Sequence, residues 1–152
     1  MNRVWTYIIS KQLNDDEIND IKIIGTDFVN SWAAHDQKLT ASFEVFKNRI
    51  IVVKVNEDVH SASGCSIDKL TRFIKDLENK FSIELMNRFL VAFKNNDNLE
   101  VVHASKIKDL LDKKYISENT VIYNTSLANS SDLMEWEQPL KNTWLSKYIE
   151  GK

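Results

Sequence analysis

Cysteine, proline and glycine are scarce in this sequence, which has one cysteine, one proline and three glycines among 152 residues. Because one cysteine cannot form a disulfide within the chain, the sequence excludes a disulfide-stapled secreted scaffold and indicates a reducing compartment. The nucleotide-binding loops G-x-x-x-x-G-K-[ST] and G-x-G-x-x-G are both absent. Glycines at positions 25, 64 and 151 are too far apart to build either loop, which argues against a P-loop ATPase and a Rossmann dehydrogenase.

Strong charge and long apolar runs are also missing. Lys and Arg number 20 against 22 Asp and Glu, so the formal net charge of −2 leaves no basic footprint for nucleic acid or an anionic membrane. No segment approaches the roughly 20 consecutive apolar residues of a membrane span. The N-terminal apolar run is too short and too polar for a signal peptide. We therefore expect no nucleic-acid partner, no membrane and a cytoplasmic location.

What is present is the composition of a folded domain, with 43% hydrophobic and 28% charged residues. The length suits a single globular domain over residues 1–152, with 124–152 forming an irregular, Trp-rich tail that packs on the body. In that tail we expect Trp136, Trp144 and Tyr148 to dock against the rest of the chain.

Hydrophobic periodicity predicts helices and strands in alternation along the body. Helical spacing of apolar residues favours helices over 15–35, 66–80 and 105–114, the last capped by Ser105. Alternating or continuous apolar runs favour strands over 4–10, 39–46, 50–55, 88–93, 99–103 and 120–123. Two hairpins lying between helices predict an α+β fold: a single domain with a five- or six-stranded, largely antiparallel or mixed sheet and about three main helices.

The segment of greatest chemical interest is V-H-S-A-S-G-C-S-I-D at Val59–Asp68, which joins an apolar strand to an amphipathic helix and holds the only cysteine. Ser63 or Ser66 can cap the helix, and Gly64 can supply a positive φ. Cys65 would then lie at the positive end of a helix dipole, which favours a thiolate. His60 and His35 are the candidate bases for such a nucleophile.

Two other interpretations of this turn stay open. Cys65 can be a small apolar packing residue beside a capped helix end, which is the commoner role of cysteine. Alternatively, the free N–H groups of a helix start can bind an anion, with the ligand-binding residues Ser61, Ser63, Gly64, Ser66 and Asp68. A phosphatase loop and a dithiol motif fail on spacing, because Thr71 and Asp68 stand where an arginine and a second cysteine are needed. Because no two histidines share metal-ligand spacing, we expect no metal and no cofactor.

W-A-A-H at Trp32–His35, S-A-S-G-C-S-I-D at Ser61–Asp68 and tryptophans near the C-terminus occur together in this chain. The combination resembles a family of short uncharacterised bacterial proteins that often carry the automatic name "ABC transporter ATPase". The resemblance covers most of the chain, S-G-C-S-I-D is its most specific element, and it implies no catalytic residues. The name conflicts with the sequence, which has no Walker A lysine loop, so we do not expect ATPase activity.

Two functional hypotheses follow from the residues. The leading one is a soluble, cytoplasmic binding or interaction module whose Ser61–Asp68 turn holds a small anionic ligand or a protein partner, because no complete catalytic constellation can be assembled. The alternative is a thiol-dependent enzyme with Cys65 as nucleophile and His60 or His35 as base.

Overall fold

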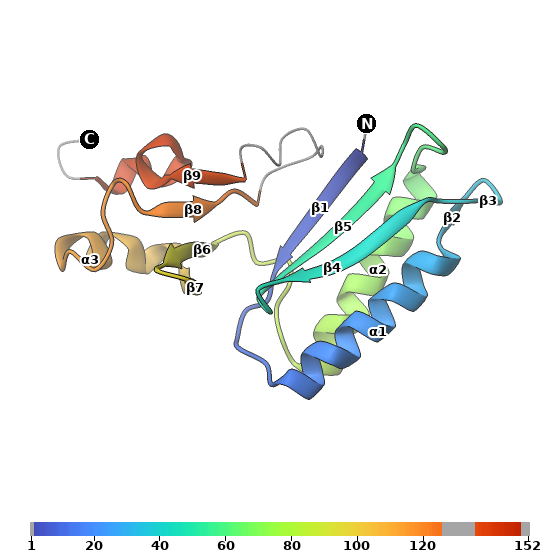
Figure 1. Cartoon of the computed structure of the whole chain (residues 1–152), viewed down its shortest axis with the longest axis horizontal. Helices are drawn as coiled ribbons and strands as arrows, with labels where there is room; N and C mark the ends of the chain where they lie inside the picture. The colour runs from blue at the N-terminus through green and yellow to red at the C-terminus, as the bar shows by residue number, and fades with distance from the viewer. Residues whose placement is uncertain (1, 126–135, 150–152) are drawn as a thin grey trace.

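A computed structural model of the chain describes residues 2–125 and 136–149 (Figure 1). The first part of the chain contains two long helices, three longer strands and a short hairpin. In order they are β1 (Asn2–Ile8), α1 (Asp15–Ser31), β2 (Ala33–Ala34), β3 (Gln37–Lys38), β4 (Ala41–Phe46), β5 (Ile50–Asn56) and α2 (Gly64–Phe81).

The second part contains shorter elements. They are β6 (Leu90–Asn95), β7 (Asn98–His103), the 3-10 turn η1 (Ala104–Lys106), α3 (Ile107–Asp112), β8 (Val121–Tyr123), β9 (Glu137–Pro139), η3 (Leu140–Asn142) and η4 (Trp144–Tyr148). None of the helices in the described ranges is long and apolar enough to cross a membrane.

The strands of the described residues form three antiparallel sheets, with the orders β1-β5-β4, β2-β3 and β7-β6-β8-β9. The predicted α+β class and its antiparallel pairing are confirmed. The expected single sheet of five or six strands is instead divided, because β1 pairs with β5 while β8 pairs with β6 and β9. In Figure 1 the four-stranded sheet lies beside the β1 edge of the three-stranded sheet.

Helix α1 forms where the sequence predicts it, with a complete capping box at its start. The side chain of Asn14 accepts a hydrogen bond from the Glu17 N–H, and Glu17 accepts one from the Asn14 N–H. Gly25, which weakens the helix intrinsically, is explained by packing, because a Cβ there would overlap the ring of Phe43 on β4. The glycine therefore allows α1 to lie close against the sheet.

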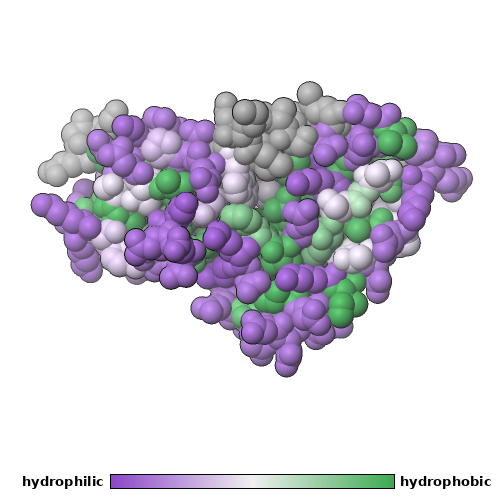
Figure 2. Space-filling model, viewed as in Figure 1, coloured by the Kyte–Doolittle hydropathy of each residue, from purple (hydrophilic) through white to green (hydrophobic). Residues whose placement is uncertain are grey.

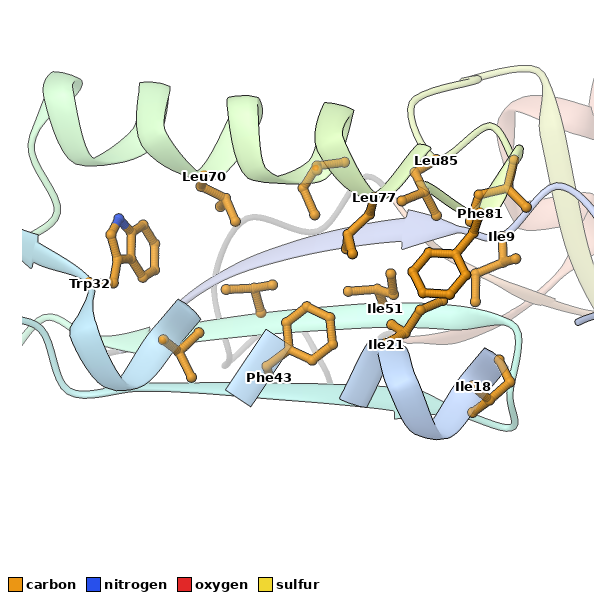
Figure 3. Packing of buried hydrophobic residues seen from close by; sticks show 14 of the residues in the cluster. Ile9, Ile18, Ile21, Trp32, Phe43, Ile51, Leu70, Leu77, Phe81 and Leu85 are labelled. Atoms are coloured by element: carbon orange, nitrogen blue, oxygen red, sulfur yellow. The ribbon is translucent and has the colours of Figure 1, made fainter. Parts of the chain in front are cut away.

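The main core lies between the two helices and one face of the three-stranded sheet. In Figure 3, Leu70 and Leu77 extend from α2 toward Ile51 of β5, and Ile21 of α1 approaches the same region. All four side chains are at most 2% exposed, so this layer removes a large apolar area from water and fixes both helices on the sheet.

The opposite face of the three-stranded sheet packs against the four-stranded sheet. Val4, Ile8 and Val52 form a buried cluster with Ala92 of β6 and Tyr123 of β8. A third cluster closes the far side of the four-stranded sheet, with α3 and the C-terminal turns packed against Phe93 and Ile122. The two sheets therefore meet along a continuous apolar layer next to β1.

Two helix boundaries differ from the sequence prediction. Helix α1 ends at Ser31, and the chain then turns through the β2-β3 hairpin, where His35 and Asp36 both have positive φ. Histidine and aspartate are among the residues that tolerate this conformation, and the hairpin stops the helix before His35. Ser105 does not cap the third helix; the His103 side chain caps the preceding 3-10 turn by accepting from the Ser105 N–H.

The three aromatic residues named in the predicted tail differ in their packing. Trp136 packs edge-on against Phe46, and Tyr148 packs against the third cluster. Trp144 is 51% exposed. The parts of the tail at 126–135 and 150–152 lie outside the described residues.

Candidate functional site

The predicted turn between β5 and α2 is a complete helix cap. Ser63 Oγ accepts from the Ser66 N–H at 3.1 Å, and Ser66 Oγ accepts from the Ser63 N–H at 2.7 Å. Ser66 Oγ also donates to the Ser63 carbonyl at 2.8 Å, and the Ser66 residue is 1% exposed. Both hydroxyl groups are thus used inside the turn, which confirms the predicted cap at Ser63.

The same turn is fixed from outside by two further bonds. The buried indole N–H of Trp32 donates to the Ser66 carbonyl at 2.8 Å. The Ala62 N–H donates to Glu57 Oε2 at 3.0 Å. Trp32 follows the last residue of α1, so this indole joins the end of one helix to the start of the other and stabilises their packing.

Cys65 and the two candidate bases are not joined by any hydrogen bond. Cys65 is an exposed free cysteine, so its interpretation as a core packing residue is wrong. His35 lies exposed in the β2-β3 turn, and His60 is partly buried before the helix. Ser61, Gly64 and Asp68 are exposed. Within the described ranges no group of His, Cys, Asp or Glu is arranged to hold a metal ion.

A cleft of about 630 Å³ lies elsewhere, where the two larger sheets meet. β1 forms one wall, the ends of β6 and β8 form another, and the 85–88 segment and the start of η4 close the sides. Thr71 of α2 also reaches it. This volume falls in the range of small-molecule sites in proteins, about 300–1,000 Å³. The β1 cleft, as we call it, contains none of the turn residues.

The wall formed by β1 carries backbone polar groups. β1 has β5 as its one strand neighbour in the described part of the chain. The Ile9 N–H donates to the Arg49 carbonyl at 2.7 Å, so Ile9 occupies a hydrogen-bonded position facing β5. Because these positions alternate in an antiparallel pair, the N–H and C=O groups of Val4, Thr6 and Ile8 are directed away from β5. All three residues line the cleft.

The hydroxyl groups of three threonines in the cleft have protein partners. Thr6 Oγ1 donates to the Thr125 carbonyl at 2.9 Å, and Thr71 Oγ1 donates to the Ile67 carbonyl at 3.2 Å. Thr143 Oγ1 donates to the Leu140 carbonyl at 2.7 Å. These threonines are therefore structural, and they hold the walls of the cleft in position.

Two tyrosines behave differently. Tyr123 is 2% exposed, and its hydroxyl is buried with no hydrogen-bond partner among the described residues. The Tyr7 hydroxyl also forms no hydrogen bond with a described residue. Burial raises the pKa of Tyr7 to about 12, and burial with a smaller effect of the Glu137 charge raises the pKa of Tyr123. Both phenols are consequently neutral O–H donors at neutral pH.

Arg88 supplies the charge of the cleft. It is the one charged side chain among the described residues that line it. Its guanidinium is exposed and forms no ion pair or hydrogen bond with a described residue. Glu137, the register partner of Tyr123, does not line the cleft. The cleft is therefore locally positive although the whole chain has a slight negative charge.

Exposed hydrophobic side chains gather at the mouth of the cleft. Met86 is 36% exposed and Trp144 is 51% exposed, and both line it. Figure 2 shows hydrophilic residues over most of the face in view, with smaller areas of hydrophobic residues between them. A few isolated apolar groups at a cleft suit a small ligand better than a broad protein interface.

No family model, curated protein or solved structure matches this chain. The resemblance to the short bacterial family therefore stays a prediction.

Sequence reasoning did not find the cleft, because its walls come from segments far apart in the chain. Tyr7 and Tyr123 each stand in an apolar strand and read as ordinary core aromatics. The available signal was weak: each tyrosine brings a hydroxyl group into a buried strand, and such a group needs a partner. Arg88 at the start of an apolar strand gave no signal on its own.

Proposed function

We propose that this protein is a non-enzymatic binding module that holds a small ligand in the β1 cleft. One observation carries the proposal: Tyr7, Tyr123 and Arg88 all line the cleft, and the polar side-chain group of none of them bonds to a described residue. Buried polar groups normally have partners, and an unpartnered one in a concave site is a position for a ligand atom.

Binding without chemistry is favoured by the acid–base character of these groups. A general base or acid works best when its pKa is near the operating pH. Tyr7 has its pKa raised to about 12, and arginine stays protonated at every physiological pH. The cleft therefore offers hydrogen-bond donors that stay protonated, which suits recognition rather than proton transfer.

The turn at Ser61–Asp68 supports a ligand less well than the cleft does. Its two inner hydroxyls bond to each other's backbone, and its N–H at Ser66 is already capped. A ligand site there, and Cys65 acting as a nucleophile, stay predictions. A cytoplasmic location is part of the same proposal, because the one thiol is free and exposed and needs a reducing environment to stay so.

The proposal is tested by screening small molecules of several classes (carboxylates, amines, sugars and nucleotides) by tryptophan fluorescence and thermal denaturation. Trp5 and Trp144 line the cleft and serve as reporters. We expect at least one class to bind saturably, to be recovered chemically unchanged, and to lose affinity in Trp144→Ala while keeping it in Cys65→Ala.

Three outcomes count against the proposal. A bound compound that is consumed would indicate an enzyme, and dependence of that turnover on Cys65 would favour the thiol alternative. Binding that is lost in Cys65→Ala and kept in Trp144→Ala would place the ligand at the turn. Absence of saturable binding by every class would contradict a small-molecule site in the cleft.

A further inference from the structure

We infer that the ligand of the β1 cleft is an amphipathic anion, a compound with a flat or aliphatic apolar body and a single acidic group. This inference rests on the proposed function and names the class of ligand. Three features of the cleft carry it: the single charge of its lining, the donor character of its unpartnered groups, and the apolar side chains at its mouth.

The charge of the lining selects the sign of the ligand. Arg88 faces no carboxylate among the described residues that line the cleft, and it forms no ion pair with a described residue. A planar guanidinium matches a carboxylate or sulfonate group, and charge-assisted hydrogen bonds are stronger than neutral ones. A cationic ligand would meet uncompensated repulsion, whereas one anionic group neutralises the one cation.

The unpartnered hydroxyls select the same chemistry. The phenols of Tyr7 and Tyr123 keep their protons because burial raises their pKa, so each has an O–H group that can donate a hydrogen bond. The backbone N–H groups of Thr6 and Ile8 are further donors directed away from β5. Donors that have no hydrogen-bond acceptor among the described residues are well satisfied by the oxygens of an acid.

The apolar part of the ligand is selected by the walls and the mouth. Val4, Trp5 and Ile122 line the cleft, and Met86 and Trp144 lie exposed at its mouth. Aromatic rings and a methionine thioether pack well against flat or flexible apolar groups. A wholly polar anion such as inorganic phosphate would leave these side chains in water and gain little from them.

A matched pair of dyes tests the inference directly. 8-Anilinonaphthalene-1-sulfonate has an aromatic body with one sulfonate, and N-phenyl-1-naphthylamine has the same rings without the charge. We expect the sulfonate to bind with one-to-one stoichiometry, to accept energy from tryptophan, and to bind about tenfold more tightly than the uncharged dye. Inorganic phosphate should not compete.

Two variants with matched controls locate the interaction. Arg88→Gln should weaken the sulfonate about tenfold and change the uncharged dye less than twofold, while Arg72→Gln, an exposed arginine outside the cleft, should change neither. Tyr123→Phe should weaken the sulfonate severalfold, and Tyr115→Phe, whose hydroxyl bonds to Glu100, should not. Circular dichroism of each variant checks that the fold is kept.

The results that would overturn the inference are distinct from failure of the proposed function. Equal affinity for both dyes, with both lost in Trp144→Ala, leaves a binding cleft and rejects the anion. Equal weakening by Arg88→Gln and Arg72→Gln would show that the dye responds to general surface charge, which also rejects it. No saturable binding of either dye would reject the inference and weaken the proposed function with it.

Discussion

The α2 turn and the β1 cleft differ in what their polar groups do. At the turn, Ser63 and Ser66 bond to each other's backbone, and the Trp32 indole N–H donates to the Ser66 carbonyl in the first turn of α2. At the cleft, the hydroxyl of Tyr123 is buried and has no hydrogen-bond partner in the part of the chain that the structure describes. Groups that are satisfied within the chain contribute to stability, and groups left unsatisfied are available to a ligand at a cost to stability.

This contrast separates helix capping from ligand binding, two roles that the sequence analysis assigned to the same turn. A serine-rich turn with a cysteine at a helix start is typical of catalytic and anion-binding sites, yet here its hydroxyls are used to begin a helix. The residues that line the cleft form no recognisable motif, but several of their polar groups have no partner among the described residues and can bind a ligand. Substitutions at the turn should therefore change stability, and substitutions at the cleft should change binding.

The largest effect is expected for a pair of tryptophans. Trp32→Ala removes a ring that is 2% exposed and leaves the Ser66 carbonyl without its donor, which should lower the free energy of unfolding by roughly 3–5 kcal/mol. Trp144→Ala removes a ring that is 51% exposed and should cost less than about 1 kcal/mol. Urea denaturation of both variants measures the difference. Equal losses in the free energy of unfolding would contradict the distinction between a structural turn and a binding cleft.

A smaller effect is expected at alkaline pH and belongs to the cleft. The pKa of Tyr7 rises from 10.0 to about 12 in the folded protein, so the folded state keeps a proton that the unfolded state releases. Stability should be complete below about pH 10 and fall as the pH passes through 12, by roughly 2–3 kcal/mol at about 1.4 kcal/mol per pKa unit.

Urea denaturation at a series of pH values, with wild type and Tyr7→Phe compared, isolates this contribution. The variant should lose less stability than wild type between about pH 10 and 12. The serine hydroxyls of the turn do not titrate, so Ser63→Ala should follow the wild-type curve, displaced downward. Parallel curves for wild type and Tyr7→Phe would show that this phenol is not held neutral by burial.

The capping serines should give effects of about 1 kcal/mol. Ser63→Ala and Ser66→Ala each remove one half of the capping box, for which helix caps typically lose about 0.5–2 kcal/mol. Ser61→Ala is the matched control, because Ser61 is exposed and its side chain forms no hydrogen bond with a described residue, and it should change stability by less than about 0.5 kcal/mol. Dye affinity should be unchanged in all three variants. Weaker dye binding in Ser63→Ala would indicate that the dye binds at the turn and not in the cleft.

Local features of the fold could be predicted from the sequence because short-range physics decides them. Asn14 and Glu17 define a capping box, and the apolar spacing of α2 predicts its buried face. The β2-β3 hairpin was missed because its strands have two residues each, too few for a periodic pattern. The division into separate sheets depends on which strands pair across the chain, which local propensity does not specify.

The candidate site was predicted less well for the same reason. The sequence located a chemically interesting turn, and the cap at Ser63 is confirmed. The cleft depends on segments that contain Tyr7 and Tyr123, 116 residues apart in the sequence, lining the same space. Whether a tyrosine hydroxyl finds a partner is a tertiary property, and neither residue type nor spacing reveals it.

The most direct measurement is thermal denaturation of Tyr123→Phe with and without 8-anilinonaphthalene-1-sulfonate. If Tyr123 keeps its hydroxyl for a ligand, removing it relieves a buried unsatisfied group, and the ligand-free variant should be more stable than wild type by up to about 1 kcal/mol. The stabilisation produced by the dye should be smaller in the variant than in wild type. A ligand-free variant less stable than wild type, with an unchanged response to the dye, would contradict the account.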